Sequence, residues 1–207
     1  MTDITFLDGG LGQEINNRST QDSAHPLWSV KVMFEEPDIV IATHKDFIRA
    51  GARVITMNNY TATIPRMTRH GFGDQFHAAH QLAAELVNKA IHQAQTEFDQ
   101  EIDVNIAGCL PPIAASYVAS AALNYDDSYD QYSQLIEIQA QHVDVFLAET
   151  ISNITEAKAA LAALKAAGQK CFIGLTLSDD LSNSLRSGES LEAAIDQLGS
   201  EGVDGVC

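Results

Sequence analysis

The sequence predicts an α/β protein in which parallel strands alternate with helices. Short apolar runs rich in β-branched residues alternate with longer segments of helical period, as expected for parallel strands joined by crossover helices. This order suits either a (β/α)8 barrel, with about six of the eight β/α units present, or an open doubly wound sheet. Several strand exits carry acid, amide, hydroxyl or glycine residues, whereas a doubly wound sheet concentrates such groups at one switch point. The exits therefore favour the barrel.

Six segments are expected to form strands because each is a short apolar run that stops at polar or glycine residues. They span residues 4–7, 52–57, 104–107, 143–148, 171–177 and 203–207. The first is followed by Asp8 and two glycines, and the fourth is followed by Glu149 and Thr150. Since the carboxyl ends of barrel strands lie on one face, we expect these exits to share that face.

Five segments have a helical pattern. They span residues 39–50, 77–98, 129–141, 155–167 and 191–198. Gly51 and Gly168 follow two of them, at the position where glycine commonly ends a helix. The polar stretch 16–28 has neither pattern and is expected to form a loop across the strand exits.

The chain is strongly acidic, with a formal net charge of -16 and twelve Lys and Arg residues. No basic run could follow a phosphate backbone, so nucleic acid is not expected as a partner. No apolar segment approaches membrane length and no signal peptide is recognisable, so we expect a cytoplasmic protein without a membrane partner. The three cysteines are too few and too dispersed for a disulfide framework, and Cys109 and Cys171 lie in apolar runs that predict buried, inert thiols.

Several common catalytic and binding motifs are absent. Residues 10–12, GLG, follow a strand, but Ile15 stands where a dinucleotide-binding motif needs its third glycine. There is no phosphate-binding loop, no lysine at a strand exit for Schiff-base chemistry and no G-x-S-x-G nucleophile motif. The histidines show no metal-binding spacing, and His77 and His80 are expected on a solvated helix face.

Two carboxylates remain as candidates for chemistry, Asp8 and Glu149, which follow different predicted strands at the same end of the sheet. Such a pair could hold a substrate ammonium group by charge-assisted hydrogen bonds. The glycines after Asp8 would let backbone and ligand approach closely. The alternative is structural, because Glu149 could instead cap the helix that follows it.

Residues 7–14, LDGGLGQE, resemble the opening motif of the homocysteine S-methyltransferase family, L-D-G-G-x-[GA]-T-E. Further matches to family motifs follow in order: residues 27–29 (LWS), His44 with residues 50–52 (AGA), residues 56–66 (TMNNYTATIPR), residues 107–112 (AGCLPP) and residues 144–150 (DVFLAET). Each match is weak by itself. Because they run in order over nearly the whole chain, their joint occurrence by chance is improbable.

The resemblance implies a (β/α)8 barrel that transfers a methyl group from a sulfonium, betaine-like or folate donor to homocysteine, giving methionine. In the family a zinc ion holds the homocysteine sulfur as a thiolate, since a free thiol with a pKa of about 8.5 is mostly protonated near neutral pH. The LWS loop resembles the branch that uses sulfonium donors such as S-methylmethionine.

The same resemblance places six residues at the substrate-binding site: Asp8, Gly9, Asn58, Tyr60, Glu149 and Thr150. The two acids would receive the homocysteine amino group, with the glycine allowing its close approach. Tyr60 would face the methyl donor, or else only pack under the 16–28 loop. Asn58 and Thr150 would support these contacts without binding substrate directly.

The sequence departs from the family at the zinc ligands. There a cysteine follows an asparagine at the end of strand six and two adjacent cysteines lie near strand eight, and neither arrangement occurs here. Cys207 has no asparagine before it, and one cysteine cannot hold catalytic zinc, which normally takes three protein ligands. We therefore expect zinc in the full-length protein and none bound by this chain.

These patterns predict that residues 1–207 form a single homocysteine-binding barrel domain that lacks its C-terminal part. Unpaired edges on its first and sixth strands would favour a homodimer or leave an inactive fragment marginally stable. Two other functions stay open: a related thiol or selenol methyltransferase with a betaine or folate donor, and a non-catalytic amino-acid-binding fragment.

Overall fold

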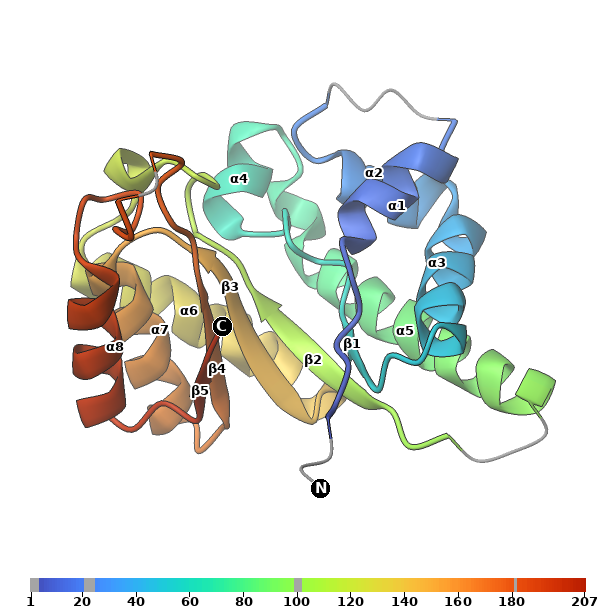
Figure 1. Ribbon diagram of the computed structural model, residues 1–207. Helices are drawn as coiled ribbons and strands as arrows, with labels where there is room; N and C mark the ends of the chain where they lie inside the picture. Colours follow the sequence, from blue (N-terminus) through green and yellow to red (C-terminus); the bar gives the residue numbers. More distant parts are fainter. Residues whose placement is uncertain (1–3, 21–24, 99–101, 181) are drawn as a thin grey trace.

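The computed structural model describes residues 4–20, 25–98, 102–180 and 182–207. Its strands form one five-stranded parallel sheet (Figure 1) in the order β1 (Val54–Thr56), β2 (Asn105–Leu110), β3 (Val145–Ile151), β4 (Cys171–Leu175) and β5 (Gly205–Val206). Each strand pairs with the next one in the sequence. This sequential order is that of a (β/α)8 barrel and excludes the doubly wound alternative, in which the strand order reverses.

The predicted first strand contacts the sheet over a shorter length than expected. Within residues 4–7, Leu7 alone forms a parallel bridge, to Val54. Two further backbone hydrogen bonds to the Phe6 carbonyl oxygen hold the segment beside β1, from the amides of Arg53 at 2.8 Å and Val54 at 3.3 Å. The segment lies at the edge of the described sheet and its apolar side chains remain exposed, so one-sided pairing supports only a bridge.

The helices cover the sheet and connect its strands. They are α1 (Leu11–Arg18), α2 (Trp28–Glu35), α3 (Pro37–Arg49), α4 (Ile64–Arg69), α5 (Phe76–Phe98), α6 (Tyr125–Gln139), α7 (Ile154–Ala166) and α8 (Leu191–Ser200), with short 3-10 turns at Gly73–Gln75, Ala119–Ala121 and Ala140–His142. In Figure 1, α3 and α5 flank the β1 end of the sheet, whereas α6, α7 and α8 flank the β4–β5 end. The five predicted helices are confirmed, and no segment of the described chain is long and apolar enough to be a membrane-spanning helix.

The prediction of an irregular loop over residues 16–28 is wrong at both ends, since Trp28 is the first residue of α2. Residues 16–18 belong to α1, whose Leu11 and Ile15 are one helical turn apart and are both buried. That short apolar stripe was too brief to stand out among polar neighbours. Residues 21–24 lie outside the described residues.

The ends of several helices are set by residues next to them in the sequence. Gly51 and Gly168 have positive φ angles of 108° and 68° just beyond α3 and α7, as predicted for helix-ending glycines. The side-chain oxygen of Asn153 accepts a hydrogen bond from the Glu156 amide at 2.7 Å and so caps the start of α7. Glu149 is therefore not the cap of this helix.

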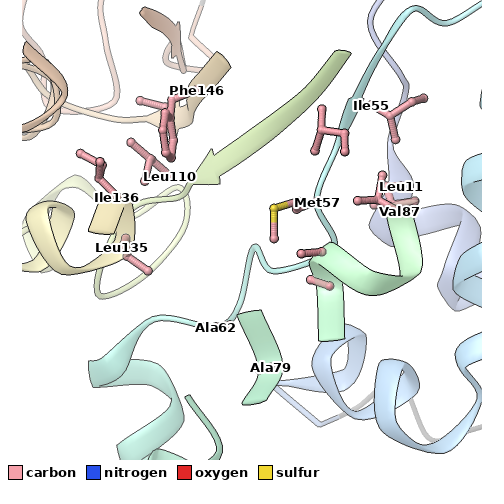
Figure 2. Packing of buried hydrophobic residues seen from close by; sticks show 14 of the residues in the cluster. Leu11, Ile55, Met57, Ala62, Ala79, Val87, Leu110, Leu135, Ile136 and Phe146 are labelled. Carbon is pink, nitrogen blue, oxygen red and sulfur yellow. The ribbon is translucent and has the colours of Figure 1, made fainter. Parts of the chain in front are cut away.

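The core fills the space between the sheet and its helices. Figure 2 shows Leu110 of β2 and Phe146 of β3 gathered beside Ile136 of α6, and all three side chains are buried. Gly108 permits this packing, because a Cβ atom there would lie 2.6 Å from the Phe146 ring. The close approach sets the relation of β2 to β3, the two strands that carry part of the site.

The prediction that His80 lies on a solvated helix face is also wrong. His77 is exposed, but His80 is buried, with Nδ1 2.9 Å from the Asn59 side-chain nitrogen and Nε2 2.9 Å from the Ala62 carbonyl oxygen. The pattern of α5 did not distinguish these two positions, because the segment that covers His80 is distant in sequence.

Candidate functional site

A cavity of about 590 Å³ opens at the carboxyl ends of β1 and β3. All six residues proposed from the sequence line it: Asp8, Gly9, Asn58, Tyr60, Glu149 and Thr150. Trp28 and Ser29 at the start of α2 line it too, as do the first residues of α1. The topology therefore brings together side chains that are up to about 140 positions apart, because successive parallel strands end on one face.

Asp8 is held by β1. Its Oδ2 accepts a hydrogen bond from the Thr56 amide at 2.8 Å, and its Oδ1 accepts one from the Thr56 hydroxyl at 2.9 Å. Burial raises the pKa of Asp8 to about 6, the two Thr56 hydrogen bonds oppose that shift, and the charge of Glu149 adds to it. The two carboxylates thus interact electrostatically within the cavity.

Glu149 projects from β3 beside Cys109 of β2. The Cys109 thiol donates a hydrogen bond to Oε1 of Glu149 at 2.9 Å. Burial raises the pKa of Glu149, and this hydrogen bond partly offsets the effect. Both carboxylates therefore lie in surroundings that disfavour an uncompensated negative charge.

The expectation that Glu149 and Thr150 follow their strand is wrong, because β3 extends to Ile151 and includes both. The register with β4 shifts between Ala148 and Ile151, and Thr150 has a φ angle of 66°. A β-branched residue rarely adopts this left-handed conformation, which costs about 1–3 kcal/mol. The irregularity redirects side chains at the cavity wall and lets strand pairing resume after it.

Tyr60 and Asn58, which follow β1, are fixed by hydrogen bonds to other segments. The Tyr60 hydroxyl donates a hydrogen bond to Ser116 Oγ at 2.8 Å, and burial raises the pKa of the Tyr60 phenol. The Asn58 side chain donates to the Ser29 carbonyl oxygen at 3.1 Å and so ties the exit of β1 to α2. Gly9 has a packing role, because a Cβ atom there would lie 2.8 Å from the Phe47 ring.

Two residues, one lining the cavity and one in contact with Glu149, had no predicted role. Cys109 is buried as expected, but its thiol contacts Glu149 and is not simply core filling. Arg66 lines the cavity from α4, its guanidinium carbon 5.6 Å from the centre of the Tyr60 ring. The sequence signal for both was their place in strand-exit motifs, at residues 107–112 and 56–66.

The described residues do not fit the zinc site that the family resemblance implies. Nowhere in residues 4–20, 25–98, 102–180 and 182–207 do three His, Cys, Asp or Glu side chains cluster in a way that could hold a metal ion. Cys207, the last residue, is exposed and does not complete such a group. No chemical step is therefore assigned to zinc on these residues.

A family model described as homocysteine S-methyltransferase matches residues 5–207. The chain belongs to the homocysteine S-methyltransferase family. This match confirms the resemblance that the sequence motifs indicated.

Individual members of the homocysteine S-methyltransferase family show how far the similarity extends. The chain is 29% identical over 190 residues to a homocysteine S-methyltransferase of Escherichia coli strain K12, covering 86% of this chain and 60% of the relative. It is 27% identical over 174 residues to a selenocysteine Se-methyltransferase of Brassica oleracea var. italica, covering 74% of this chain and 49% of the relative. The chain thus spans between about half and three fifths of the length of these relatives.

The fold matches a solved family member. The metallated form of the Escherichia coli homocysteine methyltransferase MmuM superposes with a TM-score of 0.87 and 26% sequence identity, over 99% of this chain and 74% of that protein. The predicted TIM-barrel class is confirmed by this likeness and by the sequential strand order.

Proposed function

We propose that this chain is the homocysteine-binding domain of a homocysteine S-methyltransferase that takes its methyl group from a sulfonium-type donor such as S-methylmethionine. Residues 1–207 would act as one domain in that enzyme. The observation that carries the proposal is the pair of half-buried carboxylates, Asp8 and Glu149, in a single cavity of a chain that belongs to this family.

The electrostatics of the pair suit an ammonium ligand. Burial raises the pKa of both Asp8 and Glu149, and the charge of Glu149 raises the pKa of Asp8 further. An ammonium group placed between them would compensate both charges and form charge-assisted hydrogen bonds in a largely desolvated site. The amino group of homocysteine supplies this chemistry, and the pair would then orient the thiol end of the ligand toward the donor side.

The proposed reaction is an in-line displacement at a methyl carbon. The homocysteine sulfur forms a bond to the methyl carbon as the carbon–sulfur bond of the sulfonium breaks. The donor leaves as a neutral thioether, and the thiol proton is released. Holding both ligands in this alignment is the main contribution expected from the cavity, with Tyr60, supported by Asn58 and Thr150, on the donor side.

A second candidate is methyl transfer to a selenol. The similarity to the Brassica oleracea selenocysteine Se-methyltransferase favours it, since that relative matches 74% of this chain at an identity close to that of the Escherichia coli relative. Selenocysteine is an amino acid with the same ammonium group, so the carboxylate pair would serve either substrate.

Calorimetric titration and a methyl-transfer assay test the proposal. The purified chain is titrated with L-homocysteine, L-selenocysteine and L-homoserine, which lacks a thiol. The protein made from the complete gene is then incubated with homocysteine and methyl-labelled S-methylmethionine, and labelled methionine is followed by mass spectrometry. We expect homocysteine binding and labelled methionine. Tighter binding and methylation of selenocysteine would favour the second candidate, and binding without transfer would favour a non-catalytic amino-acid-binding role.

A further inference from the structure

Arg66 introduces a positive charge into a cavity that otherwise carries acids. It is the one Lys or Arg among the described residues that line the cavity, where the ionisable acids are Asp8 and Glu149. The side chain projects from α4, the helix that follows the exit of β1, and stacks near the Tyr60 ring. The cavity therefore carries both acidic and cationic side chains.

The guanidinium of Arg66 is held in place by neutral acceptors. Its Nη2 donates to the Pro112 carbonyl oxygen at 2.6 Å and to Ser116 Oγ at 3.1 Å, and its Nε donates to the Ile113 carbonyl oxygen at 3.4 Å. Its Nη1 makes no hydrogen bond within the described part of the chain. The group is thus oriented, while one of its donors stays available to a ligand.

No described acid neutralises this charge by contact. The ion pairs of the described residues do not include Arg66. Glu156 interacts with it electrostatically, but the Glu156 carboxylate contacts the Ile113 amide and the Tyr132 hydroxyl instead. Burial lowers the pKa of the Arg66 guanidinium, as expected for a desolvated cation without a contacting anion. Arg66 is half-buried, and a charge withdrawn from water in a protein is normally paired, so a missing anion at a cavity wall points to a ligand.

We propose that Arg66, together with the Ser116 hydroxyl, binds the carboxylate of an amino-acid-type ligand in this cavity. The inference rests on the proposed function and deepens it, because the acidic pair would bind an ammonium group and Arg66 would bind a carboxylate. Homocysteine and S-methylmethionine both carry an ammonium and a carboxylate group. The free Nη1 of Arg66 can donate a charge-assisted hydrogen bond to one carboxylate oxygen, while the Ser116 hydroxyl donates to the other.

The test compares carboxylate ligands with counterparts that lack the carboxylate. Wild-type protein and the Arg66→Gln, Arg66→Lys and Arg69→Gln variants are titrated with homocysteine, S-methylmethionine, 3-aminopropane-1-thiol and (3-aminopropyl)dimethylsulfonium. Arg69 is the matched control, an exposed arginine on the same helix. Circular dichroism melting of each variant checks that it is folded.

We expect Arg66→Gln to weaken binding of at least one carboxylate ligand about tenfold or more, with little effect on its carboxylate-free counterpart. The affected ligand identifies whether the carboxylate belongs to homocysteine or to the donor. Arg66→Lys should keep part of the affinity, and Arg69→Gln should match wild type. If Arg66→Gln does not fold, two other measurements test the carboxylate site. They are the wild-type affinity for each carboxylate ligand relative to its carboxylate-free counterpart, and the same ratio in Arg66→Lys.

Unchanged affinity in Arg66→Gln, or equal weakening of a ligand and its carboxylate-free counterpart, would overturn the carboxylate site while leaving the proposed function intact. Arg66-dependent binding of S-methylmethionine without homocysteine binding would support the site and overturn the proposed function. Failure of wild type to bind any of the carboxylate ligands would overturn both.

Discussion

The Cys109 thiol on β2 donates a hydrogen bond to Oε1 of Glu149 on β3, with 2.9 Å between sulfur and oxygen. The Glu149 carboxylate makes no other hydrogen bond within the described residues. The Cys109 side chain is buried and that of Glu149 is half-buried. Because the hydrogen bond favours the charged carboxylate, it helps keep Glu149 ready for a cationic ligand.

Cys109→Ala is expected to weaken homocysteine binding about tenfold or more near neutral pH, because Glu149 would lose a hydrogen bond to its charged form. The pKa of Glu149 should then rise further, so binding should recover as the pH is raised. Cys109→Ser should retain most of the affinity, since its hydroxyl also donates. Cys171→Ala, at a buried cysteine of β4, is the matched control. Calorimetric titration between pH 5.5 and pH 8 measures the effect, and identical pH profiles for Cys109→Ala and wild type would contradict it.

Asp8→Asn and Glu149→Gln are each expected to reduce homocysteine affinity about tenfold or more, by removing one charged partner of the ammonium group. The pKa of Asp8 is raised to about 6, so wild-type affinity should fall as the pH drops through that value. Asp8→Asn should lose this part of the pH dependence. The control is Glu137→Gln, which neutralises an exposed acid on α6. The assignment fails if both site variants bind as tightly as the control.

Gly108→Ala is expected to lower the free energy of unfolding by about 1–3 kcal/mol, since the added Cβ atom would lie 2.6 Å from the Phe146 ring in a tightly packed core. Gly199→Ala is the matched control. It lies in α8 with no atom within 4 Å of the added Cβ, and should raise stability by up to about 1 kcal/mol. Urea denaturation of both variants measures the difference. Equal stabilities would show that the packing of Phe146 leaves room for a Cβ atom at residue 108.

His44 is expected to make the protein sensitive to acid. It is fully buried in α3, neither ring nitrogen has a partner among the described residues, and burial lowers its pKa from 6.5 to about 4. Between these two values the unfolded chain binds a proton that the folded protein excludes, so stability falls as the pH falls. From pH 7.5 to pH 5 this group alone should remove about 2 kcal/mol of unfolding free energy.

His44→Leu tests that contribution, because it should flatten the decline in stability between pH 7.5 and pH 5. His80, whose pKa is also lowered to about 4, would still contribute in the same direction, and Asp8 in the opposite one. His77→Leu, at an exposed position of α5, is the control. Urea denaturation across this pH range is the measurement. A decline as steep in His44→Leu as in wild type would remove His44 as its source.

The sequence by itself determined the order of strands and helices and the acids of the candidate site. Alternation of apolar runs with helical periods indicates parallel strands, and polar residues at the strand exits indicate the face on which a site forms. Asp8 and Glu149 could be singled out because both belong to local motifs next to strands. These properties depend on neighbours in the sequence, so they can be read without coordinates.

Only the tertiary structure decided which side chains meet. The burial of His80, the contact of Cys109 with Glu149 and the place of Arg66 at the cavity wall each join segments that are distant in the sequence. Thr150 adopts its left-handed conformation where the pairing of β3 with β4 shifts register. The sequence of β3 alone gives no information about that pairing. Local patterns set backbone preferences, whereas burial, unpaired charge and contact distances arise from packing between segments. The roles of Cys109 and Arg66 could therefore be inferred only once the strands and helices were assembled.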